Sequence, residues 1–413
     1  MREMKDSGIE WIGEIPKDWT VLPIKYVFNI NRGRVISVLH LVENGKYPVY
    51  SSQTENDGCF GYLNTYDFEG PAITWTTDGA KAGSVFYRDG RYNCTNVCGI
   101  LQLKESYNDV NLYFATYAIA VVAQQNKRYD INGFKIMSNE MARIKFAIPN
   151  IVEQQQIADY LDTKCSEIDA TAEDIQKEIS LLEEYKKSLV YNVISNGINH
   201  SIYSTENDEV WGNLPQGWKL VDIKYLFEIV KRIAGKEGYD VLSVTQKGLK
   251  IKDITSGDGQ LADNYCGYQF VYPTDYVMNH MDLLTGWVDC SELFGVTSPD
   301  YRVFRLIDRS AHNLVYYKYV MQCCYMNKIF YSLGQGVSNL GRWRLQTSSF
   351  NNFKVPVPPK DEQDEIADYL DSKCSEIDAI IADKKCQLDI LADYKKSLIY
   401  EYVTGKKEVP VHE

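Results

Sequence analysis

The chain has 413 residues, 45% of them hydrophobic, and its 44 Lys and Arg against 56 Asp and Glu give a net charge of −12. This length exceeds one ordinary hydrophobic core and predicts at least two globular domains plus connecting helices. The longest strongly apolar stretch, residues 112–123, has 12 residues, whereas a membrane-spanning helix needs roughly 20. The first 16 residues lack the apolar segment of a secretion signal, which predicts a cytoplasmic protein with reduced cysteines.

Residues 1–150 are predicted to form a first globular domain of mixed α/β (α+β) structure. Aromatic and β-branched stretches between Gly, Asn and Asp turns, at residues 72–77 and 83–88, predict strands. The apolar stretch 112–123 predicts a buried helix, and a polar loop with a glycine and basic residues follows at 126–135. Basic, amide and hydroxyl side chains in such turns are the types that contact DNA phosphates and base edges. The candidates in this segment are Arg32, Arg34, Gln53, Thr54, Asp78, Lys81, Lys127, Arg128 and Lys135.

Two long helices are predicted at residues 151–200 and 358–413, where apolar side chains recur at steps of three and four. Residues 157–170 recur at 366–379 with one difference, Thr163 against Ser372, so the chain contains an internal repeat with an offset of 209 residues. The predicted heptad seam consists of Leu161, Cys165, Ile168, Ile175, Ile179, Leu182 and Leu189 in the first copy and Leu370, Cys374, Ile377, Ile381, Leu388, Leu391 and Leu398 in the second.

Lysines interrupt both copies of the seam, and Lys384 stands where the first copy has Ile175. Neither copy can bury its seam alone, so two arrangements are open: the two helices pair with each other, or each docks on its neighbouring domain. Matched seams favour an intramolecular antiparallel coiled coil, which would place the two globular domains at opposite ends.

Residues 201–357 are predicted to form a second mixed α/β domain. It opens like the first, because residues 214–227 match residues 15–28, and it carries strand-like stretches at 240–245 and 301–306. The interiors of the two domains otherwise scarcely repeat. The candidates for DNA contact in this segment are Lys231, Arg232, Gln246, Lys247, Gln335, Ser338, Asn339, Arg342 and Arg344.

Motifs that carry catalysis are missing. The chain has no GxxxxGK[ST] phosphate loop, no H-E-x-x-H motif, no G-x-S-x-G turn, and no N/D-P-P-Y/F motif or Gly-rich cofactor loop. Cys94 and Cys98 could form half of a zinc site, but no second ligand pair follows at zinc-like spacing, so buried thiols are expected instead. The sequence therefore predicts a non-catalytic protein with no metal and no cofactor of its own.

The negative charge is concentrated in the predicted helices. Residues 16–150 carry 14 basic and 12 acidic side chains and residues 201–357 carry 16 of each, whereas residues 151–200 carry 4 and 10 and residues 358–413 carry 8 and 14. The overall charge therefore does not exclude DNA binding by the domains, although it predicts weak binding by the chain alone.

Several segments resemble the specificity subunit of type I restriction–modification systems over essentially the whole chain. They are DSGIEWIGEIPKDW at 6–19, DGAKAGSVFYRDGRY at 78–92, EQQQIADYLD at 153–162, GYDVLSVTQKG at 238–248 and GVTSPDYRVF at 295–304.

The resemblance implies two target-recognition domains that each read half of a split double-stranded DNA target, separated by an antiparallel coiled coil. It also implies docking of two methyltransferase subunits, which hold S-adenosylmethionine and methylate adenine, and of translocating restriction (restriction/translocase) subunits. The alternative from a different class is a non-catalytic coiled-coil scaffold whose globular domains bind protein, which the acidic charge would suit.

Overall fold

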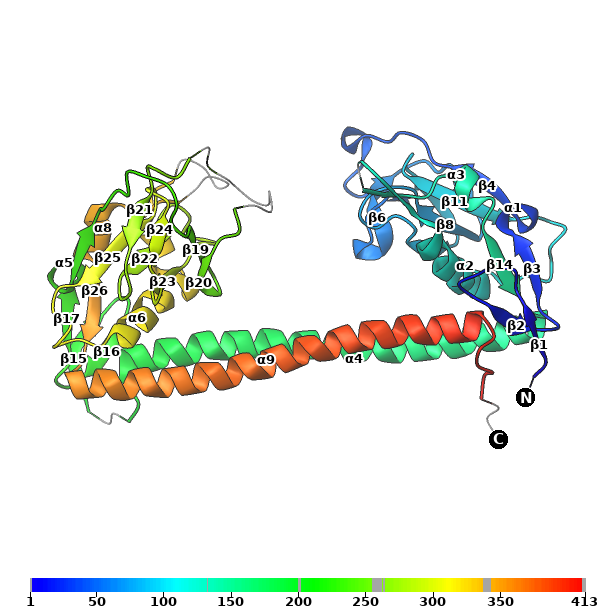
Figure 1. The fold of residues 1–413 in the computed structure, drawn as a ribbon. Coiled ribbons are helices and arrows are strands. Elements are labelled where there is room, and N and C mark those ends of the chain that lie inside the picture. Colours follow the sequence, from blue (N-terminus) through cyan, green and yellow to red (C-terminus); the bar gives the residue numbers. More distant parts are fainter. Residues whose placement is uncertain are drawn as a thin grey trace. The chain divides into compact units, whose positions relative to one another are not determined.

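The computed structural model describes residues 2–131, 133–199, 202–254, 262, 264–336 and 343–410. The chain divides into two compact units, Met1–Ile175 with Cys386–Glu413 and Gln176–Lys385. Each unit contains one mixed α/β domain and a stretch of both long helices, α4 (Ile151–Asn196) and α9 (Lys360–Val403) (Figure 1). No helix within the described ranges is long and apolar enough to cross a membrane.

The domain of the first unit is built on two four-stranded sheets. One is antiparallel with the strand order β4-β11-β8-β9, and the other has the order β6-β5-β10-β7, in which β5 and β10 are parallel. The elements of this domain are β1 (Met4–Asp6), β2 (Glu14–Pro16), β3 (Thr20–Pro23), α1 (Ile24–Val27), β4 (Phe28–Arg32), η1 (Val38–His40), β5 (Tyr47–Tyr50), η2 (Glu55–Gly58), β6 (Cys59–Leu63), β7 (Phe68–Glu69), β8 (Ala72–Thr76), β9 (Val85–Arg88), β10 (Arg91–Cys94), β11 (Cys98–Leu103), α2 (Leu112–Asn126), β12 (Arg128–Asp130), β13 (Gly133–Lys135), α3 (Ser138–Met141) and β14 (Lys145–Ile148).

Helix α2 packs against strands β8 and β9 and closes the core of the first domain. Asn111 caps this helix by accepting a hydrogen bond from the backbone N–H of Phe114 at 3.0 Å. Trp75 of β8 is fully buried and donates from Nε1 to the carbonyl of Ile136 at 3.0 Å. Gly99 of β11 lies directly against that indole, since a Cβ there would come within 2.2 Å of the ring, so only glycine fits at this position.

The domain of the second unit repeats this plan. Its sheet has the order β18-β25-β22-β23, which corresponds strand for strand to β4-β11-β8-β9, and α6 takes the place of α2. The elements are β15 (Tyr203–Asp208), β16 (Gly212–Pro215), β17 (Lys219–Asp222), α5 (Ile223–Leu226), β18 (Phe227–Val230), β19 (Leu242–Thr245), β20 (Gly248–Ile251), β21 (Gln269–Val271), β22 (Tyr276–Met278), β23 (Val288–Cys290), β24 (Gly295–Thr297), β25 (Arg302–Leu306), α6 (Leu314–Met326), α7 (Ile329–Ser332), α8 (Thr347–Asn352) and β26 (Lys354–Val357).

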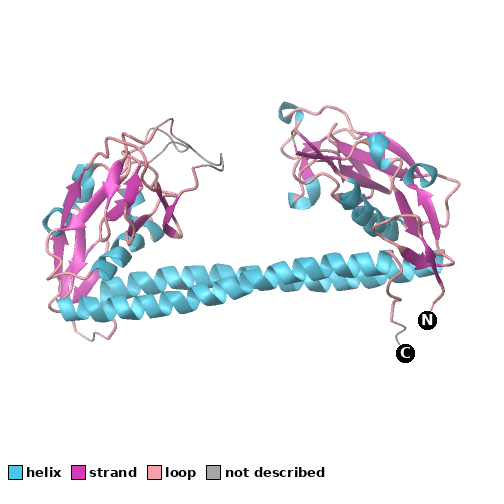
Figure 2. Cartoon of the chain, in the orientation of Figure 1, coloured by secondary structure: helices cyan, strands magenta, loops and turns pink. Residues whose placement is uncertain are grey.

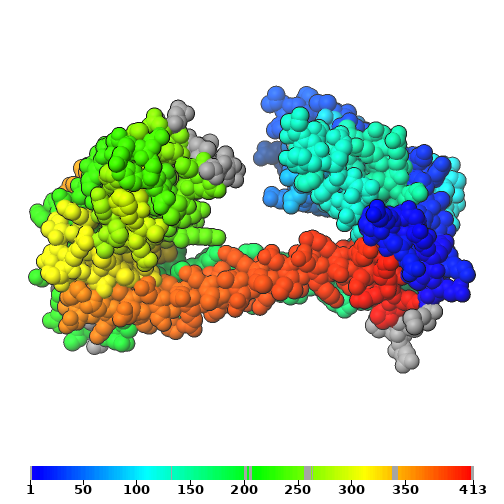
Figure 3. All heavy atoms as spheres, viewed as in Figure 1, coloured from blue at the N-terminus to red at the C-terminus, as the bar shows by residue number. Residues whose placement is uncertain are grey.

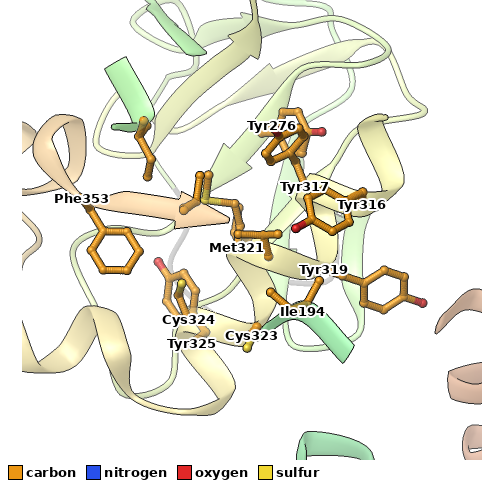
Figure 4. Packing of buried hydrophobic residues seen from close by; sticks show 14 of the residues in the cluster. Ile194, Tyr276, Tyr316, Tyr317, Tyr319, Met321, Cys323, Cys324, Tyr325 and Phe353 are labelled. Carbon is orange, nitrogen blue, oxygen red and sulfur yellow. The ribbon is translucent and has the colours of Figure 1, made fainter. Parts of the chain in front are cut away.

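The core of the second unit is rich in tyrosine and joins the domain to the long helices. Ile194 of α4 lies beside Tyr319 and Cys323 of α6 within one buried cluster, which also contains Leu370 of α9 (Figure 4). The hydroxyl of Tyr316 satisfies its hydrogen-bonding requirement by donating to the carbonyl of Pro356 at 3.0 Å. The domain and the helices therefore share a continuous core.

Helices α4 and α9 run antiparallel beside each other (Figure 2). In the first unit Lys395 of α9 pairs with Asp169 of α4 at 2.6 Å, and in the second unit Lys186 of α4 pairs with Asp378 of α9 at 2.6 Å. These partners are 17 residues apart on each helix, as one antiparallel register requires. The predicted fold class, two mixed α/β domains and an intramolecular antiparallel coiled coil, is confirmed, and the helices both pair with each other and dock on the domains.

The predicted seam residues all lie in these two helices. Those that are about nine-tenths or more buried are Leu161, Cys165, Ile168, Ile179, Leu370, Cys374, Ile377, Ile381 and Leu398. Those of intermediate burial are Ile175, Leu182, Leu189, Leu388 and Leu391. The division of the chain into four segments at 1–150, 151–200, 201–357 and 358–413 stays a prediction, because each compact unit combines a domain with parts of both helices.

Candidate nucleic-acid interface and partner surface

In the first domain, two segments distant in the sequence come together at the C-terminal end of α2. The backbone N–H of Gly79 donates to the carbonyl of Phe134 at 3.0 Å, and that of Ile136 donates to the carbonyl of Thr77 at 2.8 Å. A backbone bridge also joins Asp78 to Lys135. The structure thereby gathers a set of predicted residues that the sequence left apart. The set is Asp78, Lys81, Lys127, Arg128 and Lys135.

Ion pairs hold the β12–β13 hairpin in this cluster. Arg128 contacts Glu140 at 2.6 Å and Asp130 at 3.2 Å, and Lys135 contacts Asp130 at 2.9 Å. The hydrogen bond from Lys135, with that from the N–H of Ile131, lowers the pKa of Asp130 to about 2, so its carboxylate stays charged. Arg128 and Lys135 therefore stabilise the hairpin, in addition to any contact with a ligand.

Two cations of the cluster remain available to a ligand. Lys81 is exposed, and none of the described acidic groups forms an ion pair with it. Lys127 donates to the amide oxygen of Gln124 at 2.8 Å and lies 4.6 Å from the centroid of the Phe134 ring. These are the two side chains of the cluster best placed to contact phosphates.

The other predicted residues of the first domain have different neighbours. Arg34 pairs with Asp67 at 2.8 Å and Arg32 donates to the carbonyl of Asn96 at 2.5 Å. Gln53 donates to the carbonyl of Cys59, and Thr54 directly precedes η2. Arg34 also forms a backbone bridge with Thr95, the residue that follows β10.

In the second domain, Lys231 and Arg232 follow β18, and their side chains have different surroundings. Lys231 is exposed. Arg232 forms an ion pair with Asp275, whose side chain is 1% exposed, and its guanidinium lies 4.7 Å from the Tyr272 ring centroid. A buried carboxylate needs such a partner, so Arg232 is a structural residue of this domain.

Gln246 and Lys247 occupy the turn between β19 and β20 and face the long helices of their own unit. They line a groove of about 740 Å³ together with Lys318 of α6 and Asp371 of α9. Both side chains are exposed. Their contact with DNA stays a prediction.

Gln335 and Arg344 form a backbone bridge through hydrogen bonds of 3.0 and 3.1 Å. The side chain of Arg344 is exposed. The other three predicted residues of this loop, Ser338, Asn339 and Arg342, lie outside the described residues.

Beside this bridge lies a buried basic pair. Burial, with the positive charges of Arg302 and Arg344, lowers the pKa of His280 to about 3, and burial lowers that of Arg302 to about 10. Arg302 is satisfied by the carbonyl of Leu345 at 3.1 Å and stacks on the ring of Phe350 at 4.5 Å. Both residues therefore contact the backbone of Leu345, next to Arg344.

Each domain docks on a long helix through contacts that sequence reasoning missed. In the first unit, Trp19 donates from Nε1 to Glu153 at 3.1 Å, and the hydroxyl of Tyr117 donates to Asp162 at 2.7 Å. Gln154 is fully buried; its Oε1 accepts from the N–H of Asn111 at 2.8 Å, and its Nε2 donates to two backbone carbonyls at 2.9 Å. These side chains fix the N-terminal part of α4 to the domain.

The second unit contains the equivalent contacts, and their partners on α9 follow those on α4 by the repeat offset of 209 residues. Trp218 donates to Glu362 at 2.9 Å, and Tyr319 donates to Asp371 at 2.7 Å. Gln363, 1% exposed, accepts from the N–H of Asn313 at 2.9 Å. The signal was available in the sequence, because the opening tryptophans and the Glu-Gln pair both recur, but a helical glutamine by itself predicts a solvated position.

The helices also carry exposed apolar side chains outside the seam. Leu181 and Tyr185 on α4 are 64% and 57% exposed, and their repeat equivalents on α9, Ile390 and Tyr394, are 61% and 54% exposed. Much of the α9 surface, orange to red, is open on the face drawn in Figure 3. We call Leu181 with Tyr185, and Ile390 with Tyr394, the two outer patches.

A lysine borders each outer patch. In the first unit the pKa of Lys164 is raised, first by its hydrogen bond to Glu167 and further by Tyr160 and Tyr394. In the second unit the pKa of Lys373 is raised, first by Glu376 and further by Tyr369 and Tyr185. The two patches therefore have equivalent surroundings, one in each unit.

Metal chemistry has no support in the described part of the chain. No group of three or more His, Cys, Asp or Glu that could hold a metal is found there. Cys94 and Cys98 are buried, and the pKa of Cys94 is raised, first by its hydrogen bond with Cys98 and then by burial. The expectation of buried thiols at this pair is confirmed.

Comparison with known proteins identifies the family. The family model described as the type I restriction modification DNA specificity domain matches residues 16–181 and again residues 215–388. The N-terminus of a putative type I specificity subunit from Mycoplasma pneumoniae is 43% identical over 141 residues, which is 34% of this chain and 74% of that N-terminal chain. A second putative type I specificity subunit from the same organism is 35% identical over 180 residues, 42% of this chain and 58% of that protein.

A solved structure supports the same fold. A chain from work on complex assembly and conformational transition of the type I R–M system superposes with a TM-score of 0.66 at 12% identity, covering 95% of this chain and 99% of that chain. Specificity subunits are non-catalytic. The two matches to the family model, the curated relatives and the two-domain fold place this chain in the family of type I restriction–modification specificity subunits.

Proposed function

We propose that each domain of this chain reads one half of a bipartite double-stranded DNA target, and that the helix pair sets the gap between the halves. The observation that carries this proposal is the repeat. Two domains with the same strand order are fixed to their helices by equivalent contacts, such as Trp19 with Glu153 and Trp218 with Glu362. The two domains are attached to the helices in the same way but have different loops. This arrangement suits a protein that reads two different short DNA sequences.

The cluster at the end of α2 is the proposed DNA-contacting surface of the first domain. Lys81 and Lys127 would contact phosphates, while Gln124 and Asp78 lie beside them with groups that can address base edges. In the second domain, we assign Lys231 and Arg344, two of the exposed cations among the predicted residues, to phosphates.

The outer patches are the proposed docking surface for two methyltransferase subunits. Two equivalent apolar patches, one in each unit, suit two copies of one partner. S-adenosylmethionine would bind to those partners, and translocating restriction (restriction/translocase) subunits would join the complex for cleavage. The acidic surface of the helices suits partners that bring positive charge to the DNA.

The alternative function is a scaffold whose domains bind protein. To decide between the two, the chain is co-expressed with type I methyltransferase subunits encoded beside it, and methylated adenines are mapped across the genome by single-molecule sequencing. The proposal predicts methylation in a split motif with two short specified halves and a constant unread gap. Methylation that does not depend on this chain would favour the scaffold.

A further inference from the structure

The hairpin of β12 and β13 presents apolar side chains to solvent at its tip. Ile131 is 95% exposed, Tyr129 is 76% exposed and Phe134 is 36% exposed. Tyr129 and Phe134 pack edge to face with ring centroids 5.5 Å apart, so they form one aromatic surface behind Ile131. A cluster of exposed apolar side chains is a candidate contact surface when the groups around it favour one occupant.

The hairpin is firmly mounted. Its two strands pair from Arg128 with Lys135 to Asp130 with Gly133, and the carbonyl of Phe134 accepts from the N–H of Gly79 at 3.0 Å. The ion pairs of Arg128 with Glu140 at 2.6 Å and of Lys135 with Asp130 at 2.9 Å hold it from both strands. Both strands of the hairpin are therefore held against the rest of the domain.

The charges around the tip favour nucleic acid as the occupant. Arg128 and Lys135 lie on the hairpin, Lys127 directly precedes it, and Lys81 lies two residues after Gly79, which contacts the hairpin. These four cations outnumber the neighbouring carboxylates of Asp78, Asp130 and Glu140. A two-stranded ribbon is narrow enough to enter a groove of B-DNA. Proteins that deform DNA insert apolar side chains between base pairs while cations beside them contact the phosphates.

Another exposed apolar segment of the same domain lacks these features. Val38 and Leu39 in η1 are 66% and 93% exposed, but residues 35–45 contain no lysine or arginine. Leu39 is therefore a matched control for Ile131, because both are large, apolar and almost fully exposed.

We propose that Ile131, supported by Tyr129, enters the base stack of the half-site bound by the first domain and unstacks one base step. This inference rests on the proposed function, and it adds a sequence preference that comes from how readily that step unstacks. We call the inserted Ile131 side chain the wedge. It acts on the half-site that the first domain binds, and this is a different event from any extrusion of the target adenine by a methyltransferase subunit.

The test uses the complex assembled with its methyltransferase subunits, in the absence of S-adenosylmethionine. 2-Aminopurine is placed in turn at each position of the first half-site that is not methylated, and fluorescence and affinity are measured for the wild type, Ile131→Ala and Leu39→Ala. The wild type and Leu39→Ala should raise the fluorescence at one step. Ile131→Ala should lose that signal and bind roughly tenfold more weakly.

A second measurement separates unstacking from other contacts. An abasic site at the responsive step removes the stacking that the wedge must break, so it should return the affinity of Ile131→Ala to within about twofold of the wild type. Unchanged affinity and fluorescence in Ile131→Ala, or loss of a methyltransferase subunit from that complex, would overturn the wedge and leave the proposed function standing. A wild-type complex without sequence-specific binding would overturn both.

Discussion

Gln154 shows how a single polar side chain joins a domain to a helix. Its side chain makes three hydrogen bonds while fully buried, to the N–H of Asn111 and to the carbonyls of Asp109 and Pro149. The burial of Gln154 could not be predicted from the run of glutamines around it, because it depends on the loop at Asn111, 43 residues earlier in the chain. Arg232 is a similar case, since its role is set by the distant Asp275.

Replacing Gln154 by leucine should destabilise this junction. The substitution leaves the N–H of Asn111 and two carbonyls without a partner in a buried site, at a cost of about 2–4 kcal/mol. Hydrogen exchange of the amides of α2 measures the free energy of local opening. The exposed Gln156→Leu is the control and should leave exchange unchanged. Equal protection in both variants would contradict this account of the junction.

His280 should make the second unit sensitive to acid. Its imidazole is held neutral in the folded state with a pKa of about 3, whereas in the unfolded chain it binds a proton below about pH 6.5. The unfolded state then binds one more proton, so stability falls as the pH drops from about 6.5 towards 3, by up to about 1.4 kcal/mol per pH unit. Urea unfolding at several pH values should show this slope in the wild type and in His40→Gln. If His280→Gln keeps the same slope, another group is responsible.

At the scale of elements, the repeat made most of the fold predictable. The strands expected at 72–77, 83–88, 240–245 and 301–306 are present, and the helix pair is antiparallel. The role of the lysines in the seam was harder to predict, because a lysine at a core position of the heptad indicates only that the apolar seam is interrupted there. Lys384 pairs with Glu178, and Lys186 and Lys395 pair with aspartates across the helices, so these lysines help to fix the register.

At the same scale, the outer patches are the proposed docking surface for the methyltransferase subunits. Leu181→Ser with Tyr185→Ser removes the patch of the second unit, and both side chains are exposed, so the helix pair itself should be unaffected. Native mass spectrometry should then show one methyltransferase subunit per chain where the wild type binds two. The exposed neighbour Glu184→Ser is the control.

Removing both outer patches should abolish docking. A chain that lacks the apolar side chains at Leu181, Tyr185, Ile390 and Tyr394 and still binds two methyltransferase subunits would place docking elsewhere.

At the scale of the whole molecule, the sequence could not predict which loop residues would contact DNA. The loop residues of the two domains do not repeat, and their partners, as for Lys135 with Asp78 and Asp130, are set by tertiary packing. The frame around them does repeat. A constant frame with variable loops is consistent with a protein whose targets differ while its architecture is kept.

The central claim is that two domains read two half-sites at a spacing set by the helix pair. Seven residues are inserted after Lys177 and seven after the repeat-equivalent Cys386, so that both ion pairs across the helices keep their partners. Each insertion adds about 10 Å at ~1.5 Å per residue, close to three base pairs of DNA at ~3.4 Å each. The methylated motif of this variant is then mapped genome-wide in complex with the methyltransferase subunits. We predict two unchanged half-sites with a gap longer by about three base pairs, whereas an unchanged gap with full methylation would contradict the account.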